Sequence, residues 1–363
     1  MFEYRALANL NYYLIILKPA YHDPISTGHS RSEAMQHYIT RFLILAVISI
    51  PLAGQAASPL GPPIAEFFKN ENRIARAVLV EKLPGDRISI RVDAFLFQND
   101  DELVNLKVDD HVFADVEAGK EYVLVFSRFR KNRLVRDEWE VNPEGPALIE
   151  ARGLGTPAIY TNNAAILTLL TPPENRDGVS KDAETSMLLS LAENNGDVRA
   201  KELAIFELYL RNDLQGAISG NNAERYATLT VSADPRLKNF LLQGARMFPE
   251  EYRTPWQGQE YRKVVEAYGT ELDLNSDVPL LIKNSLSGLG KEGTVDDLEM
   301  IGTHLYSNAP GVARAALQAL DAIDPGQALT LAQRAVQSDQ IHVVTLRELT
   351  SFIEQYAGND AFN

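Results

Sequence analysis

Hydrophobic and polar positions follow two different patterns along the chain. Residues 87–94 alternate strictly, with Ile88, Ile90 and Val92 on one face and charged or hydroxyl side chains on the other. A period of two is typical of a half-buried β-strand. Further short strands are expected between turns rich in Gly, Pro, Asn and Asp, at residues 74–80, 104–108, 111–114, 122–129, 134–141, 147–151 and 159–160.

The strand pattern predicts a small antiparallel barrel or sandwich. Turn signals recur at intervals of roughly 8–12 residues, which is typical of such folds. Residues 122–126 (YVLVF) are apolar throughout, so we expect a central strand covered on both faces.

From residue 183 onward the apolar positions indicate helices, arranged in pairs. Second helices are expected to begin near Val198, Pro235, Val278 and Val312, at steps of 37, 43 and 34 residues. Asp, Asn or Pro at each start is a helix-initiation signal. Each is preceded by a first helix, and a last pair closes the chain: residues 185–193, 223–231, 259–268, 294–306, and then 326–336 with 341–356.

The spacing of these pairs is that of a helical repeat. Residues 308–323 (NAPGVARAALQALDAI) and 196–210 (GDVRAKELAIFELYL) resemble the second helix of a HEAT repeat, with a turn containing Asp or Asn followed by small and Leu positions. The resemblance covers about the last 180 residues and implies an α-solenoid. An irregular helical bundle is the alternative.

The β-rich part is similar in outline to OB-type barrels and netrin-like modules. Residues 119–126 (GKEYVLVF) match a pattern shared by netrin-like and tissue-inhibitor modules, but the cysteines of the animal versions are absent, so no activity carries over. The expected fold is therefore α+β and multidomain. A small antiparallel β-barrel or sandwich (OB-like) precedes an α-solenoid of helix pairs (HEAT-like).

A secretory signal peptide is expected near the start. Residues 42–53 form an apolar run of 12 after Arg41, and Gly54 and Ala56 are small residues suited to cleavage between Ala56 and Ala57. A transmembrane anchor and a core helix are the alternatives, but 12 helical residues span only about 18 Å. Because 34 residues precede Met35, we expect residues 1–34 to be a non-native extension and 35–56 to be the signal peptide. The mature protein would be periplasmic or secreted, with no stable membrane span.

The remaining chain divides by composition. A β domain is expected over residues 57–170, a polar linker over 171–182 (TPPENRDGVSKD) and the helical repeat over 183–363. Removing residues 1–56 takes away four basic and three acidic side chains, so the net charge changes from −14 to −15. This acidic balance argues against nucleic-acid binding.

Composition and motifs offer little catalytic chemistry. The absence of cysteine excludes disulfides, Cys-ligated zinc and a thiol nucleophile. We expect no cofactor and no metal, and we interpret His304 and His342 as packed or surface side chains. Residues 288–293 (GLGKEG) match a dinucleotide fingerprint formally, but a helix precedes them, so we interpret them as a turn before a Thr294–Asp297 capping box. The paired carboxylates Asp100 and Asp101 are interpreted as a solvated loop.

The one local anomaly is a basic segment in this acidic chain. Residues 128–136 hold five cations. Lys131 and Asn132 are expected to turn a hairpin between the strands at 122–129 and 134–141, with Arg128 and Arg130 on the face opposite Phe129. Such a patch could bind a partner protein, a phosphate or an acidic glycan. A solvated hairpin that protects a strand edge is the alternative. The candidate partner-binding residues are Arg128, Phe129, Arg130, Lys131, Arg133 and Arg136.

These features favour a non-enzymatic exported binding or scaffold protein whose partner is another protein. Two alternatives stay open. One is an exported hydrolase whose site forms only in three dimensions, recognisable by a pocket with a histidine or a carboxylate pair of perturbed protonation. The other is a glycan or anionic-ligand site on the β domain, recognisable by an open groove lined by an aromatic side chain beside residues 128–136.

Overall fold

The computed structural model describes residues 62–360, apart from 136–137, 177, 195 and 255. The extension over residues 1–34, the signal peptide over 35–56, the cleavage residues Ala56 and Ala57, and Arg136 lie outside the described residues.

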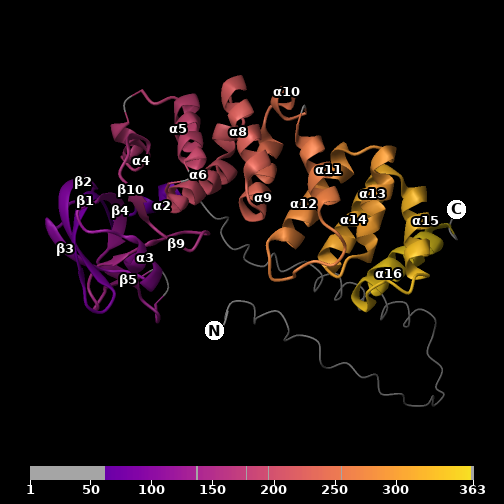
Figure 1. The fold of residues 1–363 in the computed structure, drawn as a ribbon, viewed down its shortest axis with the longest axis horizontal. Helices are drawn as coiled ribbons and strands as arrows, with labels where there is room; N and C mark the ends of the chain where they lie inside the picture. The colour runs from indigo at the N-terminus through magenta and orange to yellow at the C-terminus, as the bar shows by residue number, and fades with distance from the viewer. Residues whose placement is uncertain (1–61, 136–137, 177, 195, 255, 361–363) are drawn as a thin grey trace, which may run out of the picture. The chain divides into compact units, whose positions relative to one another are not determined.

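The β-rich part is a closed five-stranded barrel (Figure 1). The strands run around it in the order β1 (Asn72–Leu83), β2 (Arg87–Phe97), β3 (Leu103–Lys107), β7 (Ala147–Leu148) and β4 (Glu121–Ser127), and β4 pairs with β1 to close it. Neighbours are antiparallel except β3 and β7. Register shifts along β1 bend this long strand so that it pairs on both sides. Of the two predicted architectures, the barrel is confirmed.

Strand β4 contributes to two cores at once. Its alternate side chains Leu124 and Phe126 point into the barrel, whereas Val123 and Val125 pack with the following helices and with Tyr160 of β10 (Ile159–Thr161). All four valine, leucine and phenylalanine side chains are fully buried. The prediction of a strand covered on both faces is confirmed.

One predicted strand is wrong, and the strand predicted over 134–141 is confirmed only at its end, in β6 (Trp139–Val141). Residues 111–114 belong to the helix α3 (Asp110–Asp115), which connects β3 to β4. Only Val112 of this helix is fully buried, and Asp110 lies in its first turn, where the helix dipole favours a negative charge. A single inward side chain suits one helical turn over the barrel end better than a strand.

The helical part consists of stacked pairs. The pairs are α5 (Lys181–Glu193) with α6 (Val198–Leu210), α8 (Gly220–Ser232) with α9 (Pro235–Gly244), α11 (Gln257–Ala267) with α12 (Val278–Glu292), α13 (Leu298–Thr303) with α14 (Pro310–Ile323), and α15 (Pro325–Val336) with α16 (Val343–Asp360). The second helices contact one another in succession, α6 with α9, α9 with α12, α12 with α14 and α14 with α16 (Figure 1).

Short elements fill the connections: α2 (Pro63–Phe67), β5 (Phe129–Lys131), β6 (Trp139–Val141), β8 (Glu150–Ala151), β9 (Thr156–Pro157), α4 (Ala164–Leu169), η1 (Pro173–Asn175), α7 (Asn212–Gln215), η2 (Ala245–Met247), α10 (Glu250–Arg253), η3 (Val295–Asp297) and η4 (His304–Tyr306).

Side-chain caps fix where several helices begin. Asp197, Asp234 and Asp324 each accept a hydrogen bond at 3.0 Å from the backbone N–H three residues later. Pro follows at the first or second position of α9, α12, α14 and α15, where a missing N–H costs nothing. The predicted starts of the second helices α6, α9, α12 and α14 are therefore confirmed, with an Asp cap at the first two and Pro in the first turn of the last two.

The predicted turn at residues 288–293 is wrong, although the capping box of Thr294 and Asp297 is confirmed. Helix α12 continues to Glu292, with Gly288 in its interior. A Cβ at Gly288 would lie 2.4 Å from the Tyr261 ring of α11. The glycine is thus a contact surface between paired helices and does not end the helix.

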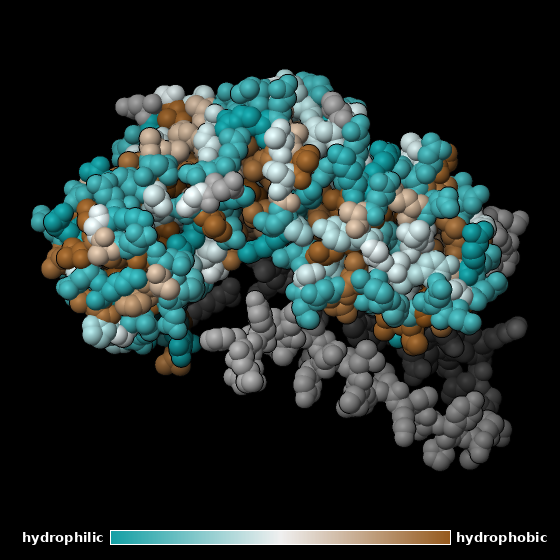
Figure 2. All heavy atoms as spheres, viewed as in Figure 1, coloured by the Kyte–Doolittle hydropathy of each residue, from teal (hydrophilic) through white to brown (hydrophobic). Residues whose placement is uncertain are grey.

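The cores join the two parts of the described chain. One cluster runs from α2 and the outer side of β4 through α4, α5 and α6 to α9, a second fills α11 to α16, and a third fills the barrel. Figure 2 shows hydrophobic residues in separate patches and hollows of that face, among residues that are mostly hydrophilic.

Candidate functional site

The basic segment forms a small hairpin of its own outside the barrel sheet. The predicted turn at Lys131 and Asn132 is wrong, because Lys131 is still paired within the hairpin, and the predicted strand 122–129 is divided between β4 and β5. Strand β5 pairs with β6, so that Phe129 lies opposite Val141 and Lys131 opposite Trp139. Arg130 lies opposite Glu140 on the other face, as the predicted alternation requires. The hairpin presents an aromatic and aliphatic face and a charged face.

Arg128, the first cation of the basic segment, forms ion pairs with the loop between β2 and β3 of the barrel. Its guanidinium bonds the Asp100 carboxylate at 2.6 Å and that of Asp101 at 2.6 Å. Burial is the largest single influence and raises the pKa of Asp100, but the Arg128 hydrogen bond, the Asp101 N–H and the charges of Arg128 and Arg73 together hold the pKa below its usual value. The structure thus joins two features that the sequence placed separately, the acidic loop and the basic hairpin.

The remaining hairpin cations differ in their availability. Arg130 pairs with Glu140 at 2.9 Å, and the Lys131 ammonium lies 5.9 Å from the centre of the Trp139 ring. Arg133 is exposed and makes no ion pair with another described residue. Phe129 is half-buried. Lys131 and Arg133 are therefore the described cations of the hairpin that a partner could reach without displacing a carboxylate.

The hairpin also exposes apolar side chains. Leu134 is 94% exposed, Val141 70% and Val135 49%, while Trp139 is 39% exposed. Beneath the hairpin, a groove of about 330 Å³ lies between Trp139, α2 and β8. An aromatic side chain and a cation, Lys131, thus line an open groove beside the basic segment.

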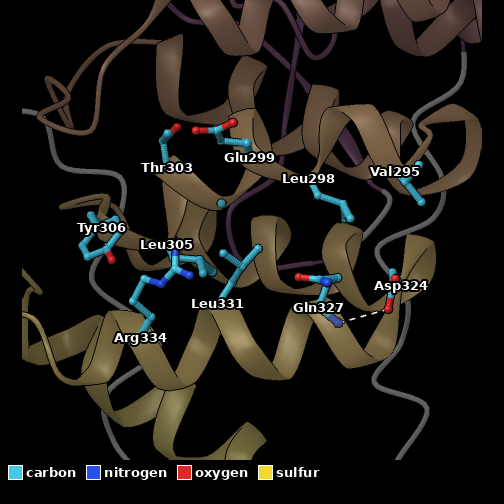
Figure 3. A pocket seen from close by; sticks show the side chains of 11 residues that line it. Val295, Leu298, Glu299, Thr303, Leu305, Tyr306, Asp324, Gln327, Leu331 and Arg334 are labelled. Atoms are coloured by element: carbon cyan, nitrogen blue, oxygen red, sulfur yellow. Dashed lines mark hydrogen bonds between the residues drawn. The ribbon is translucent and has the colours of Figure 1, made fainter.

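A larger groove of about 580 Å³ lies between α13 with η4 and α15 (Figure 3). Leu298 and Leu331 reach toward it from the two sides, and Leu305 completes an apolar floor. Gly302 lets α15 approach closely, since a Cβ there would meet the Leu331 side chain at 3.3 Å.

The rim of this groove between helix pairs is polar. Glu299 and Thr303 stand on one side and Gln327 and Arg334 on the other (Figure 3). Neither Glu299 nor Arg334 forms an ion pair with another residue in the described part of the chain. An acceptor and a donor are therefore free at opposite edges of an apolar trough.

A third cavity, of about 790 Å³, follows the seam between the barrel and α6 and includes His111. Across this seam, Arg199 of α6 forms an ion pair with Asp115 of α3 at 2.7 Å, and the Thr161 N–H donates to the Asp197 carboxylate at 2.6 Å. These contacts attach the barrel to the first long helix pair, so we interpret the seam as an internal interface.

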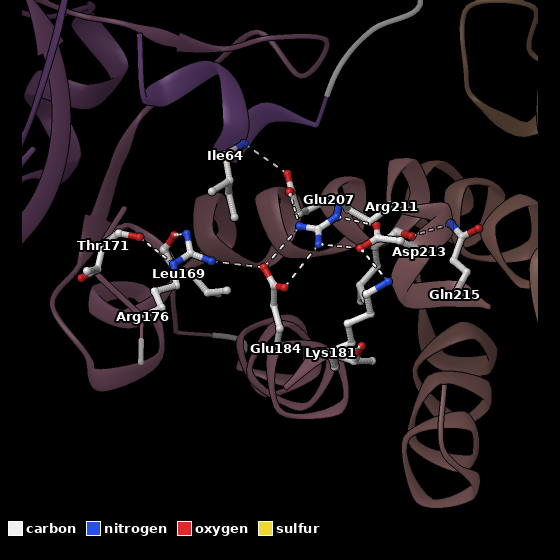
Figure 4. Close-up of polar contacts among 12 residues, drawn as sticks. Ile64, Leu169, Thr171, Arg176, Lys181, Glu184, Glu207, Arg211, Asp213 and Gln215 are labelled. Atoms are coloured by element: carbon white, nitrogen blue, oxygen red, sulfur yellow. Dashed lines mark hydrogen bonds and ion pairs between the residues drawn. The ribbon is translucent and has the colours of Figure 1, made fainter. Parts of the chain in front are cut away.

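A buried network of charges lies between α2, α5 and α6 (Figure 4). Glu207 of α6 is 1% exposed and accepts a hydrogen bond from the Ile64 N–H at 3.1 Å. Burial raises the pKa of Glu207 to about 7, despite the opposing effects of that N–H and of Arg211. Glu207 thus ties the short helix α2 to the helical part.

The same network also binds residues of the segment 171–182, which the sequence predicts as a linker. Glu184 accepts from Arg176 and from Arg211, each at 3.2 Å. Arg176 also donates to the Thr171 carbonyl at 2.6 Å and to that of Leu169. This arrangement fixes the path of the chain after α4.

The histidines of the helical part are structural. His304 is buried, its Nε2 lies 2.9 Å from the Val265 carbonyl oxygen, and burial lowers its pKa. His342 pairs with Glu271 at 3.0 Å. The interpretation of both as packed or surface side chains is confirmed. Within residues 62–360 as described, three His, Asp or Glu side chains nowhere gather as a metal site would require.

Comparison with protein-family models, with curated proteins and with solved structures gives no match. Among the described helices, none is long and apolar enough to cross a bilayer.

Sequence reasoning missed the groove between helix pairs and the Glu207 network. Both depend on which helices become neighbours. The sequence does contain a glycine within a helix, Gly302, and a charged residue among the apolar residues of α6, Glu207. Neither residue alone indicates which element it will contact. A charged residue at a core position of an amphipathic helix was the one available hint of a buried ion network.

Proposed function

We propose that this protein is an exported, non-enzymatic binding or scaffold protein, acting in the periplasm or outside the cell after removal of the signal peptide. We infer that its helix pairs are HEAT-like repeats of a solenoid and that the barrel is similar in outline to netrin-like modules. The partner is another protein, held by the helical array with the β module contributing a second surface. Stacked repeats commonly present extended surfaces of this kind.

The observation that carries the proposal is the groove between α13 and α15. Its apolar floor, with Leu298, Leu305 and Leu331, suits one or two apolar side chains of an incoming segment. The free Glu299 carboxylate and Arg334 guanidinium can bond the polar groups of that segment. No histidine lines the groove, and of its two carboxylates Asp324 already caps α15 by accepting from the Gln327 N–H. Glu299 is then the one carboxylate available to a partner, which favours binding over hydrolysis.

Site-directed photo-crosslinking in the native envelope tests this proposal. A photoreactive amino acid at Gln327, on the rim, is expected to yield a discrete adduct with one protein, identified by mass spectrometry. The matched control places the same group at Gln333, which is also exposed on α15 but does not line the groove.

A blocking variant makes the test specific to the groove. Thr303→Arg adds a long side chain at the exposed rim and is expected to reduce the Gln327 adduct at least about tenfold, a loss of about 1.4 kcal/mol. Equal adducts at both positions, or no adduct at Gln327, would contradict the proposal.

A second candidate function is ligand binding by the β module. The groove beneath the hairpin, lined by Trp139 beside Lys131, is the feature that favours it.

A further inference from the structure

The groove beneath the hairpin has a floor that is formed before any ligand arrives. Phe67 and Asn72 at its base are buried, and the Asn72 amide donates to the Glu66 and Phe67 carbonyls at 3.2 and 3.3 Å. These bonds join the end of α2 to the start of β1, so the groove needs little ordering on binding.

Trp139 forms one wall and leaves part of its ring in contact with solvent. The cross-strand partner Lys131 restrains the ring, with its ammonium 5.9 Å from the ring centre. The chain has one other tryptophan, Trp256, which packs between the helices and donates its indole N–H to the Tyr252 carbonyl. A flat aromatic wall above a polar groove suits a ligand with an apolar face and polar edges.

The charges around the groove define the ligand more narrowly. Glu66 is neutralised by Lys69 at 2.5 Å and by Arg152 at 3.4 Å. Glu71 and Glu150 form no ion pair within the described part of the chain. The groove is thus lined both by free carboxylates and by the Lys131 ammonium. The carboxylates would repel an anionic ligand, and the ammonium would repel a cationic one.

We propose that this groove binds one neutral sugar residue of a glycan, with the apolar face of the sugar ring against Trp139. Sugar hydroxyls both donate and accept, so they can bond Glu71 and Glu150 as donors and Lys131 as acceptors. A volume of about 330 Å³ is at the small end of ligand pockets, which suits one ring with the chain continuing over the open rim. This inference rests on the second candidate function and replaces an anionic ligand with a neutral one.

Intrinsic fluorescence and calorimetry test this proposal with three neutral probes: maltotriose, cellotriose and triacetylchitotriose. In the full chain carrying Trp256→Phe, Trp139 is the one remaining tryptophan and is excited selectively at a wavelength that tyrosine does not absorb. At least one probe is expected to change the Trp139 emission in a saturable way. By calorimetry, Trp139→Ala is expected to weaken that binding at least about tenfold, whereas Trp139→Phe retains most of it because a smaller aromatic face remains. Circular dichroism checks that each variant is folded.

Three results would overturn the proposal. The first is the absence of a saturable response to any of the three probes up to about 10 mM, which is weaker than ordinary ligand sites. The second is an equal affinity of Trp139→Ala and the parent chain for the probe. The third is binding of trigalacturonate alone, weakened by added salt, which would identify an anion site. Each result leaves the photo-crosslink at Gln327 unaffected, because that position lies on α15 and the groove beneath the hairpin is built from α2, β6 and β8.

Discussion

At the scale of single residues, Glu207 links the stability of the fold to pH. Its pKa is about 7 in the folded protein against an ordinary value of 4.5. Between these values the folded state holds a proton that the unfolded state has lost, so the free energy of unfolding falls as pH rises through this window and stays low above it. The shift corresponds to a loss of about 3 kcal/mol.

We predict that Glu207→Gln removes this pH dependence. The amide oxygen still accepts from the Ile64 N–H, but the side chain no longer titrates. Urea unfolding at pH 5 and pH 8 should show a smaller stability difference in the variant than in the parent chain. Glu224→Gln, at an exposed position of α8, is the control and should follow the parent profile. Parallel profiles for Glu207→Gln and the parent would contradict the prediction.

At the scale of elements, two tyrosine–glycine contacts hold paired helices together. A Cβ at Gly244 of α9 would lie 2.6 Å from the Tyr226 hydroxyl of α8, and one at Gly288 of α12 would lie 2.4 Å from the Tyr261 ring of α11. Both tyrosines are buried, and the Tyr226 hydroxyl donates to the Leu241 carbonyl at 2.9 Å. A methyl group would displace the tyrosine at either site.

We predict that Gly244→Ala and Gly288→Ala each lower the free energy of unfolding by about 1–3 kcal/mol, the usual cost of overpacking. This happens although alanine is the better helix former. Gly258→Ala is the matched control, since its Cβ would meet neighbours at an ordinary 3.5 Å, and it should be neutral or slightly stabilising. Thermal and urea unfolding measure all three.

The double variant Gly244→Ala with Tyr226→Phe identifies the cause. Removing the hydroxyl takes away the atom that the new methyl group would strike, so the two substitutions should cost less together than the sum of their separate costs. Strict additivity would show that the clash does not explain the loss.

The same elements show what the sequence could predict and what it could not. Strand 87–94, the apolar strand 122–126 and the helices started by Asp197 and Asp234 follow from local periodicity and capping, which act within a few residues. The interior position of Gly288 in α12 could not be predicted from local patterns, because its contact residue Tyr261 lies on another helix.

The candidate sites were predictable only in part, for the same reason. A hairpin in this segment and the opposite faces of Phe129 and Arg130 follow from the local alternation, whereas the strand ends and the turn of the hairpin do not. The pairing of Arg128 with Asp100 and the grooves require strands and helices that meet only after folding. Glu207 and Ile64 are 143 positions apart in sequence, so no local pattern connects them.

At the scale of the whole molecule, the barrel and the first helix pairs share one core. Val123, Val125 and Tyr160 on the outer side of the barrel pack in the same cluster as Leu188 of α5 and Leu203 of α6. Arg199 and Glu207 add polar links from α6 to Asp115 and to the Ile64 N–H. The barrel therefore uses the helices as its outer wall, and we expect neither to be fully stable without the other.

We predict that a fragment of residues 62–170 lacks a cooperative unfolding transition, because it would expose the buried face with Val123, Val125 and Tyr160 to water. A fragment of residues 62–249, which keeps α5 to α9, should unfold cooperatively, since it retains the helices whose side chains complete the core cluster on the outer side of the barrel. Near-ultraviolet circular dichroism during urea unfolding distinguishes the two. A cooperative transition in the shorter fragment would show that the barrel is an independent domain ending near residue 170, as the linker composition of 171–182 predicts, and would reduce the shared core to a simple contact between domains.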